Sequence, residues 1–375
     1  MRVKPHKLFE NFMAALAAEP EASVVHSLAA PPRLGDFLHE LDPDLSLDWS
    51  GRSFQGLPEL RDKVIARLGY APQCSAEDVL ITAGTAEANF LAISNLVGPN
   101  DEMIVDVPGW PQPLVLGEAL GAVIRKLPRH ENRGWAFDLD ELEALITPKT
   151  RLIFICNPNN PTGHLLGEAE LVQVVDLADR VGAYVLTDEV YRGLEWSDRR
   201  TPGAASLYAR GISTGSVSKA LGLQGLRTGW LVCRDAKLVF DSVVLREDTS
   251  EIMNIMGEAI ASIALGETRY RQAIARARQD GIGNLDLLDR FIAATPAMSW
   301  QRPAAGLIGF CRLDLPINAD EFAARLLAPP YRTFAMSGSA YGYPQHVRLG
   351  GGGGDPTALQ KGLERVQCLL DVHQA

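Results

Sequence analysis

The stretch that decides the fold is SVSKALGLQGLRTGW, residues 216–230. A short apolar run precedes it at 212–216 and another ends it at 229–234, and each has the length of a buried strand. Lys219 follows the first run among small hydroxyl residues and glycines, which is unusual for a solvated surface lysine. A lysine withdrawn from water beside another cation has a lowered pKa and can form a Schiff base. Arg227 is suited to pair with a phosphate.

Short apolar runs alternate with helical patterns on both sides of this stretch. The expected strands are 78–82, 102–107, 122–127, 151–156, 183–188, 212–216 and 229–234. The expected helices between them are 86–96, 111–119, 139–146 and 168–180. Strands that are apolar on both faces and separated by helices predict a mostly parallel sheet with helices on both sides. Ligands of such sheets bind at the carboxyl ends of the strands.

The pattern changes after residue 234. Long helices are expected over 237–265 and 267–293, short strands at 307–313 and 346–349, and further helices at 319–327 and 356–372. This mixture predicts a small α+β domain over 246–375, after a large domain over 46–245. The Pro- and Ala-rich segment 1–45 carries no strand pattern and is expected to be an arm that contributes to the small domain.

Composition excludes several classes of function. The chain has 375 residues, which suggests about two domains, and its net charge of −10 argues against nucleic acid or an anionic membrane as a partner. The five cysteines are widely spaced and form no C-x-x-C pair, so neither a disulfide framework nor a metal site is expected. No apolar run reaches the roughly 18 residues needed to span a bilayer. We therefore expect a cytoplasmic protein.

Three more polar turns follow expected strands. The turn TAGTAEA at 82–88 places small residues at a helix start, which suits a phosphate, although a plain strand-to-helix turn needs the same residues. The turn NPNNPTG at 157–163 is rigid and unusually polar for its place after a buried strand. In TDEVY at 187–191, Asp188 ends an apolar strand, where a carboxylate requires a cationic partner or several hydrogen bonds unless it caps a helix.

The four segments together are more specific than any one of them. They read Gly-Thr-Ala at 84–86, Asn-Pro-x-Asn-Pro-Thr-Gly at 157–163, Asp-x-x-Tyr at 188–191 and Ser-x-Ser-Lys-x-x-Gly-x-x-Gly-x-Arg-x-Gly at 216–229. In this order the chain resembles the class I/II aminotransferases, which are fold type I enzymes that depend on pyridoxal 5′-phosphate (PLP). The resemblance is strong over 51–234. It implies an α/β fold with a seven-stranded, mostly parallel sheet and a smaller α+β domain, and a homodimer, because the family's active site lies at a dimer interface.

The resemblance also implies catalytic roles. Lys219 would carry PLP as a Schiff base and move the proton at the substrate Cα. Asp188 would keep the pyridine nitrogen protonated, so that the ring accepts electrons. Asn160 and Tyr191 would donate hydrogen bonds to the ring 3′-oxygen. Trp110 would stack on the ring, with a core tryptophan as the alternative interpretation.

Further residues are assigned to the phosphate and to the substrate by the same resemblance. The phosphate would be held by Gly84, Thr85, Ala86, Ser216 and Arg227, with Ser218 as an additional candidate. Arg348, in Val-Arg-Leu at 347–349, matches the arginine that binds the α-carboxylate of an L-amino acid. Asn160 would also face the substrate.

The N-terminal part departs from the family pattern. The usual glycine-containing substrate segment is missing, and LAAPP at 28–32 occupies its place. Phe54 stands where many relatives have a tyrosine that reaches the phosphate of the partner subunit. The glycine run 350–354 is unusual and is expected to be a flexible loop before a helix. His26 lies just before the substrate segment; it is either structural or a second acid or base near the substrate.

Two reactions are compatible with the sequence. Transamination is the main interpretation. The alternative is elimination, replacement or cyclisation of a substituted amino acid, as in the capreomycidine-forming cyclases of guanidino amino acids. The acidic stretch 246–251 would then receive a guanidinium, unless it is an exposed helix face. A PLP-binding regulator is not expected, because the chain is acidic and shows no helix-turn-helix pattern.

Overall fold

The computed structural model describes residues 2–48, 50–197 and 200–374. Its larger sheet has eight strands in the order β3-β10-β9-β8-β7-β4-β5-β6. Their bounds are β3 Val79–Thr82, β4 Glu102–Val107, β5 Val123–His130, β6 Ala136–Phe137, β7 Thr150–Cys156, β8 Tyr184–Asp188, β9 Gly211–Ser216 and β10 Gly229–Cys233. Strands β5, β4, β7, β8 and β9 are parallel, and β10 runs antiparallel to both β9 and β3. The seven predicted strands are confirmed, and the two-residue β6 is an addition at the edge.

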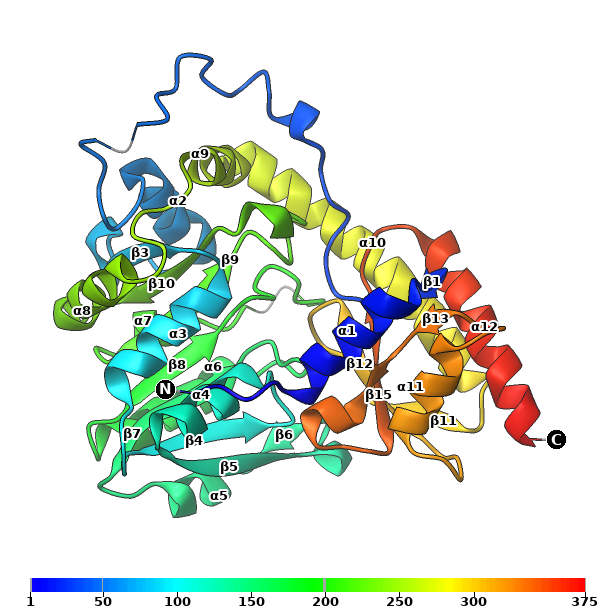
Figure 1. The fold of residues 1–375 in the computed structure, drawn as a ribbon. Coiled ribbons are helices and arrows are strands. Elements are labelled where there is room, and N and C mark those ends of the chain that lie inside the picture. Colours follow the sequence, from blue (N-terminus) through cyan, green and yellow to red (C-terminus); the bar gives the residue numbers. More distant parts are fainter. Residues whose placement is uncertain (1, 49, 198–199, 375) are drawn as a thin grey trace.

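Helices cover both faces of this sheet, as the strands' two-sided apolarity requires (Figure 1). The helices of this part are α2 Pro58–Leu68, α3 Thr85–Leu96, α4 Gln112–Leu120, α5 Leu139–Leu145, α6 Glu168–Asp179, α7 Ala204–Leu207, α8 Ala236–Glu247 and α9 Ile255–Ala264. Strand β7 shows the alternation directly. Its Phe154 packs with Leu91 of α3, and its Ile153 and Ile155 pack with Val174 of α6 in a separate core cluster.

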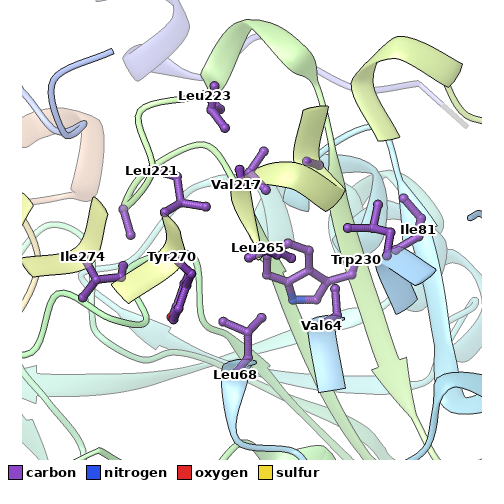
Figure 2. Close-up of a cluster of buried hydrophobic side chains, with 14 of the residues drawn as sticks. Val64, Leu68, Ile81, Val217, Leu221, Leu223, Trp230, Leu265, Tyr270 and Ile274 are labelled. Carbon is purple, nitrogen blue, oxygen red and sulfur yellow. The ribbon is translucent and has the colours of Figure 1, made fainter. Parts of the chain in front are cut away.

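A third buried cluster joins the larger sheet to the helices α2, α9 and α10 Glu267–Ala293 (Figure 2). Trp230 of β10 and Ile81 of β3 pack here against Val64 of α2. Tyr270 and Ile274 extend the cluster along α10. Because α10 also packs on the smaller sheet, it connects the two parts of the molecule.

The smaller sheet is formed by both ends of the chain. Strands β11 Met298–Trp300, β12 Ile308–Leu313, β15 His346–Gly351 and β14 Met336–Ser337 are antiparallel, and β2 Val25–His26 adds to β15 in parallel. Strand β1 Ala22–Ser23 pairs separately with β13 Thr333–Phe334. The remaining helices are α1 Lys7–Ala18, α11 Ala319–Leu327 and α12 Pro356–Gln374. The expectation that residues 1–45 carry no strand was therefore wrong, because two-residue strands are too short to show a period of two.

The prediction of a single helix over 237–265 was also wrong. This segment is two helices, α8 and α9, separated by residues 248–254 (Figure 1). The backbone N–H groups of Thr249, Ser250 and Glu251 all donate to the carbonyl of Arg246, and Glu251 has a left-handed φ of 54°. Asn254 then caps the new helix by accepting from the N–H of Gly257 at 3.0 Å. Local polar side chains outweigh helix propensity here.

The glycine run after Arg348 is not simply a flexible loop. Gly350 and Gly351 belong to β15 and pair with Val25 and His26. A Cβ on Gly350 would lie 2.1 Å from the carbonyl oxygen of His26, far inside van der Waals contact. These glycines therefore let the backbone of the N-terminal arm lie directly against β15.

The substitution Gly350→Ala tests this close approach. The methyl group would push the arm away, so we expect the free energy of unfolding to fall by about 2 kcal/mol or more, measured by urea denaturation. The matched control is Gly283→Ala in α10, where nothing lies within 4 Å of the added Cβ. That control should be neutral or gain roughly 0.5–1 kcal/mol from helix propensity. Equal effects of the two substitutions would contradict the close approach.

Candidate active site

Most of the predicted site residues meet in one cavity of about 230 Å³ at the carboxyl ends of the parallel strands. The predicted residues that line it are Thr85, Ala86, Trp110, Asn160, Asp188, Tyr191, Ser216, Ser218, Lys219, Arg227 and Arg348. Arg348 comes from β15 of the smaller sheet, and the others come from the larger sheet and its loops. The cavity therefore lies where residues of the two sheets meet.

Lys219 lies at the end of β9, in the turn that leads to β10. Its Nζ donates to Oγ of Ser27 at 3.0 Å and lies 5.7 Å from the centre of the Tyr191 ring. Withdrawal from water, followed by the nearby charge of Arg348, lowers the pKa of Lys219 to about 7, although Asp188 opposes this shift. A substantial fraction of the amine is therefore neutral, and nucleophilic, at neutral pH.

Asp188 ends β8 and is buried. Its Oδ2 accepts from Nδ2 of Asn89 at 2.9 Å, and its Oδ1 accepts from the N–H of Val190 at 3.1 Å. Burial raises the pKa of Asp188 to about 6, against these two hydrogen bonds. Thr214 fixes the amide of Asn89 by donating to its Oδ1 at 2.8 Å. The carboxylate thus lines the cavity and has no cation in direct contact among the described residues, which makes it a natural acceptor for an N–H⁺ group.

A cup of polar groups lies at the start of α3. Arg227 donates from Nη2 to the carbonyl oxygen of Ala83 at 3.3 Å. Gly84 has a φ of 82°, and a Cβ there would lie 2.6 Å from Nη2 of Arg227, so a glycine is required for this packing. Gly84 itself does not line the cavity. Among the described residues, the buried Oγ1 of Thr85 has no hydrogen-bond partner, as a site for an external acceptor would leave it.

Arg348 is held by a network that the sequence did not reveal. Its Nη1 donates to Oη of Tyr341 at 3.1 Å and to Oδ1 of Asn160 at 3.3 Å, and its Nη2 donates to the carbonyl of Val25 at 3.2 Å. Its Nε is buried without a hydrogen-bond partner in the described chain. Nε and the second N–H of Nη2 therefore have no acceptor among the described residues, and two N–H groups suit the two oxygens of a carboxylate.

A buried ion pair holds the polar turn 157–163 in place. Asp106 and Arg129 pair with almost no exposure, and Asp106 also accepts from Nδ2 of Asn159 at 3.2 Å. Burial raises the pKa of Asp106, while Arg129 opposes the shift. Asn159 in turn accepts from the N–H of Thr162 at 3.2 Å. This network fixes the turn and so presents Asn160 to the cavity.

The geometry refines one expectation from the sequence and corrects another. His26 does not line this cavity, and its ring lies near Gly353, but it lines an adjoining cavity that shares Ser27, Lys219 and Arg348 with the first. The adjacent Ser27 contacts Lys219. The stretch 246–251 does not reach the cavity either. Arg246 is buried and donates to the carbonyls of Ile81 and Phe54, and Ser250 donates to Glu87 at 2.7 Å.

Several lining residues were missed from the sequence. Asn89 lies one helical turn after Thr85, and that spacing was the one available signal. Ser27 and Phe12 come from the N-terminal arm, and their places depend on contacts between the chain ends, which no local pattern encodes. Tyr341, in the short turn before β15, does not line the cavity but accepts from Arg348, and it was missed as well.

Comparisons with known proteins agree with this geometry. The family model for aminotransferase class I and II matches residues 51–366. Capreomycidine synthase of Streptomyces vinaceus is 28% identical over 320 residues, which cover 85% of this chain and 80% of that protein. Aspartate aminotransferase of Streptomyces avermitilis is 27% identical over 333 residues, which cover 84% and 80%. A PLP-dependent aminotransferase structure from Streptococcus suis matches with a TM-score of 0.91 at 26% identity, over 100% of this chain and 99% of that chain. These matches confirm the fold class and the family resemblance predicted from the sequence.

The lowered pKa of Lys219 is directly testable. In protein free of added ligands, trinitrobenzenesulfonate should modify Lys219 with a midpoint near pH 7, followed by peptide mass spectrometry. Arg348→Met should move this midpoint upward, because loss of the neighbouring positive charge favours the protonated amine. The exposed Lys237, whose pKa is raised by Asp241, is the internal control and should react only at much higher pH. A Lys219 midpoint near that of Lys237 would contradict this description of the site.

Proposed function

Because the chain belongs to the aminotransferase class I and II family, we propose that Lys219 binds PLP covalently and that the enzyme acts on the α-amino group of an L-amino acid. The cofactor is PLP, and the protein is an aminotransferase-like enzyme. The observation that carries the proposal for Lys219 is its position. The amine lines the cavity together with the carboxylate of Asp188 and the guanidinium of Arg348, and the charges of both groups affect its pKa.

The cavity residues fit this cofactor. The cup formed by Thr85, Ser216 and Arg227 would hold the phosphate, and the unpaired Oγ1 of Thr85 would gain an acceptor there. Asp188 would face the pyridine nitrogen. Tyr191, whose buried hydroxyl has no partner in the described chain, would donate to the ring oxygen.

Two further side chains complete this cradle. Asn160 would hydrogen-bond the ring oxygen beside Tyr191, and Trp110 would cover one face of the ring.

When bound, PLP withdraws electrons from the substrate Cα and so stabilises negative charge there. Lys219 would take the proton from Cα and return it, because its pKa of about 7 suits both steps. Asp188 would hold the proton on the ring nitrogen, since its buried carboxylate is stabilised by a positive charge beside it. Arg348 would bind the α-carboxylate through Nε and the second N–H of Nη2 and so orient Cα toward Lys219.

The central test compares Lys219→Ala with Lys237→Ala. PLP-loaded wild-type protein should show the visible absorbance of the lysine-bound cofactor, and Lys219→Ala should lose it together with at least about 100-fold of the activity. Lys237 is exposed on α8 and pairs with Asp241, away from the cavity, so its replacement should change neither. Undiminished absorbance in Lys219→Ala would refute the proposal.

A second reaction is favoured by one comparison. The similarity to capreomycidine synthase supports elimination, replacement or cyclisation on a substituted amino acid as the alternative to transamination. Incubation with amino acids, including hydroxylated arginines, separates the two. Accumulation of pyridoxamine phosphate and a requirement for a keto acid would establish transamination, whereas turnover without a keto acid would establish the alternative.

We also propose a homodimer. Exposed apolar side chains support it: Phe240 and Val244 lie one turn apart on α8 with 66% and 50% exposure, and Leu47 is 69% exposed. Burial of such groups stabilises association. Light scattering should give twice the chain mass of 40.7 kDa, and a stable monomer with full activity would contradict the proposal.

The redox state of the five cysteines is relevant to the cellular compartment of the protein. All of them are free thiols, and four are buried. This usage suits a reducing compartment, so we propose a cytoplasmic location. Among the described residues, no helix is both long and apolar enough to cross a membrane.

A further inference from the structure

We propose that Ser27 relays protons between Lys219 and the side chain of the substrate, which enables this site to expel a leaving group from the substrate β-carbon. The inference rests on the proposed function of Lys219 and adds a catalytic residue and an activity to it. It starts from the hydrogen bond between Nζ of Lys219 and Oγ of Ser27, at 3.0 Å.

Backbone contacts hold Ser27 in place. The preceding residue, His26, pairs with Gly351 in the smaller sheet, and the N–H of Ala29 donates to the carbonyl of Lys219 itself at 2.9 Å. A Cβ on Gly222 would lie 2.6 Å from the carbonyl of Ala30, so the arm also lies tightly on the turn after Lys219. Ser27 is 8% exposed. The hydroxyl therefore has a fixed position relative to the amine, as proton transfer requires.

Ser27 also lies at the junction of two cavities. The second cavity, of about 420 Å³, shares five lining residues with the first, among them Ser27, Lys219 and Arg348. Its other walls are mainly apolar, with Leu16 and Phe334 among them, and also include the polar side chains of Ser23 and His26. A substrate with its carboxylate on Arg348 and its Cα at Lys219 would direct its side chain past Ser27 into this second cavity.

The hydrogen bond is present with the amine of Lys219 free, as this amine would be while it accepts the proton from Cα. Nζ would then donate that proton to Oγ of Ser27 while the hydroxyl of Ser27 donates its own proton to the leaving group. The electron pair of the former Cα–H bond would form a Cα–Cβ double bond as the bond from the β-carbon to the leaving group breaks. The electron pair of that bond would depart with the leaving group, so that the substrate loses one neutral HX. No oxidant or reductant is needed.

The leaving group provides a sharp test. Elimination from L-serine requires a proton on the departing hydroxide, whereas 3-chloro-L-alanine loses chloride without one, and both yield pyruvate and ammonia. In the PLP-loaded enzyme, Ser27→Ala should slow pyruvate release from L-serine by about 100-fold and leave release from 3-chloro-L-alanine within about threefold. Ser27→Thr, which keeps a hydroxyl, should retain activity on L-serine.

Controls separate a relay from a structural effect. Ser53→Ala removes a hydroxyl that lines neither cavity, where Ser53 accepts from the N–H of Gln55 at 3.2 Å, and should affect neither substrate. In protein without PLP, Ser27→Ala should move the modification midpoint of Lys219 downward, because the protonated amine loses an acceptor.

Equal slowing of both substrates, or no pyruvate from L-serine with the wild-type enzyme, would overturn the relay. Either result, with the lysine-bound absorbance intact, would leave the proposed function of Lys219 in place. Absence of that absorbance in the wild type would refute the proposed function instead.

Discussion

The amine of Lys219, withdrawn from water and influenced by two arginines and one carboxylate, is the feature on which this site depends. Burial and the charges of Arg348 and Arg227 disfavour its protonated form, and Asp188 favours it. Burial shifts the pKa of Asp188 in the opposite direction, because it disfavours the ionised form of the carboxyl group. Both groups therefore titrate near neutrality, where each can exchange a proton. A cofactor that is an aldehyde at one end and a basic ring nitrogen at the other would satisfy both.

Burying these charged groups together is energetically unfavourable, and apolar packing elsewhere in the fold compensates for it. Asp188 and Ser216 are carried by neighbouring strands of one sheet, whose two faces are covered by separate apolar clusters. The guanidinium of Arg348 comes from the other sheet, and α10 packs on both parts. Apolar burial elsewhere thus holds together charges that would otherwise separate into water.

The sequence predicted the features that short patterns encode. Apolar runs indicated the strands of the larger sheet, and motif order indicated the residues at their ends, such as Asp188 and Lys219. The sequence could not place Ser27, because its contact with Lys219 joins residues 192 positions apart and depends on sheet pairing. It could not place Tyr341 either, because the contact of Tyr341 with Arg348, seven residues away, depends on the shape of a turn. It also failed at residues 248–254, where side-chain and backbone hydrogen bonds interrupt a helix whose propensity was adequate.

The difference between residues in short motifs and residues placed by long-range contacts also explains why family membership leaves the reaction open. The residues expected around the ring, such as Asp188, serve any reaction that begins by removing the Cα proton. In the proposed mechanism the outcome after that step would depend on where Nζ of Lys219 can deliver the proton, and the N-terminal arm contacts this amine. The arm is attached through backbone pairing with β15 and through close packing on Gly350 and Gly222. Backbone attachment leaves its side chains free to differ without loss of the fold, so the arm is the element in which a change of reaction would be encoded.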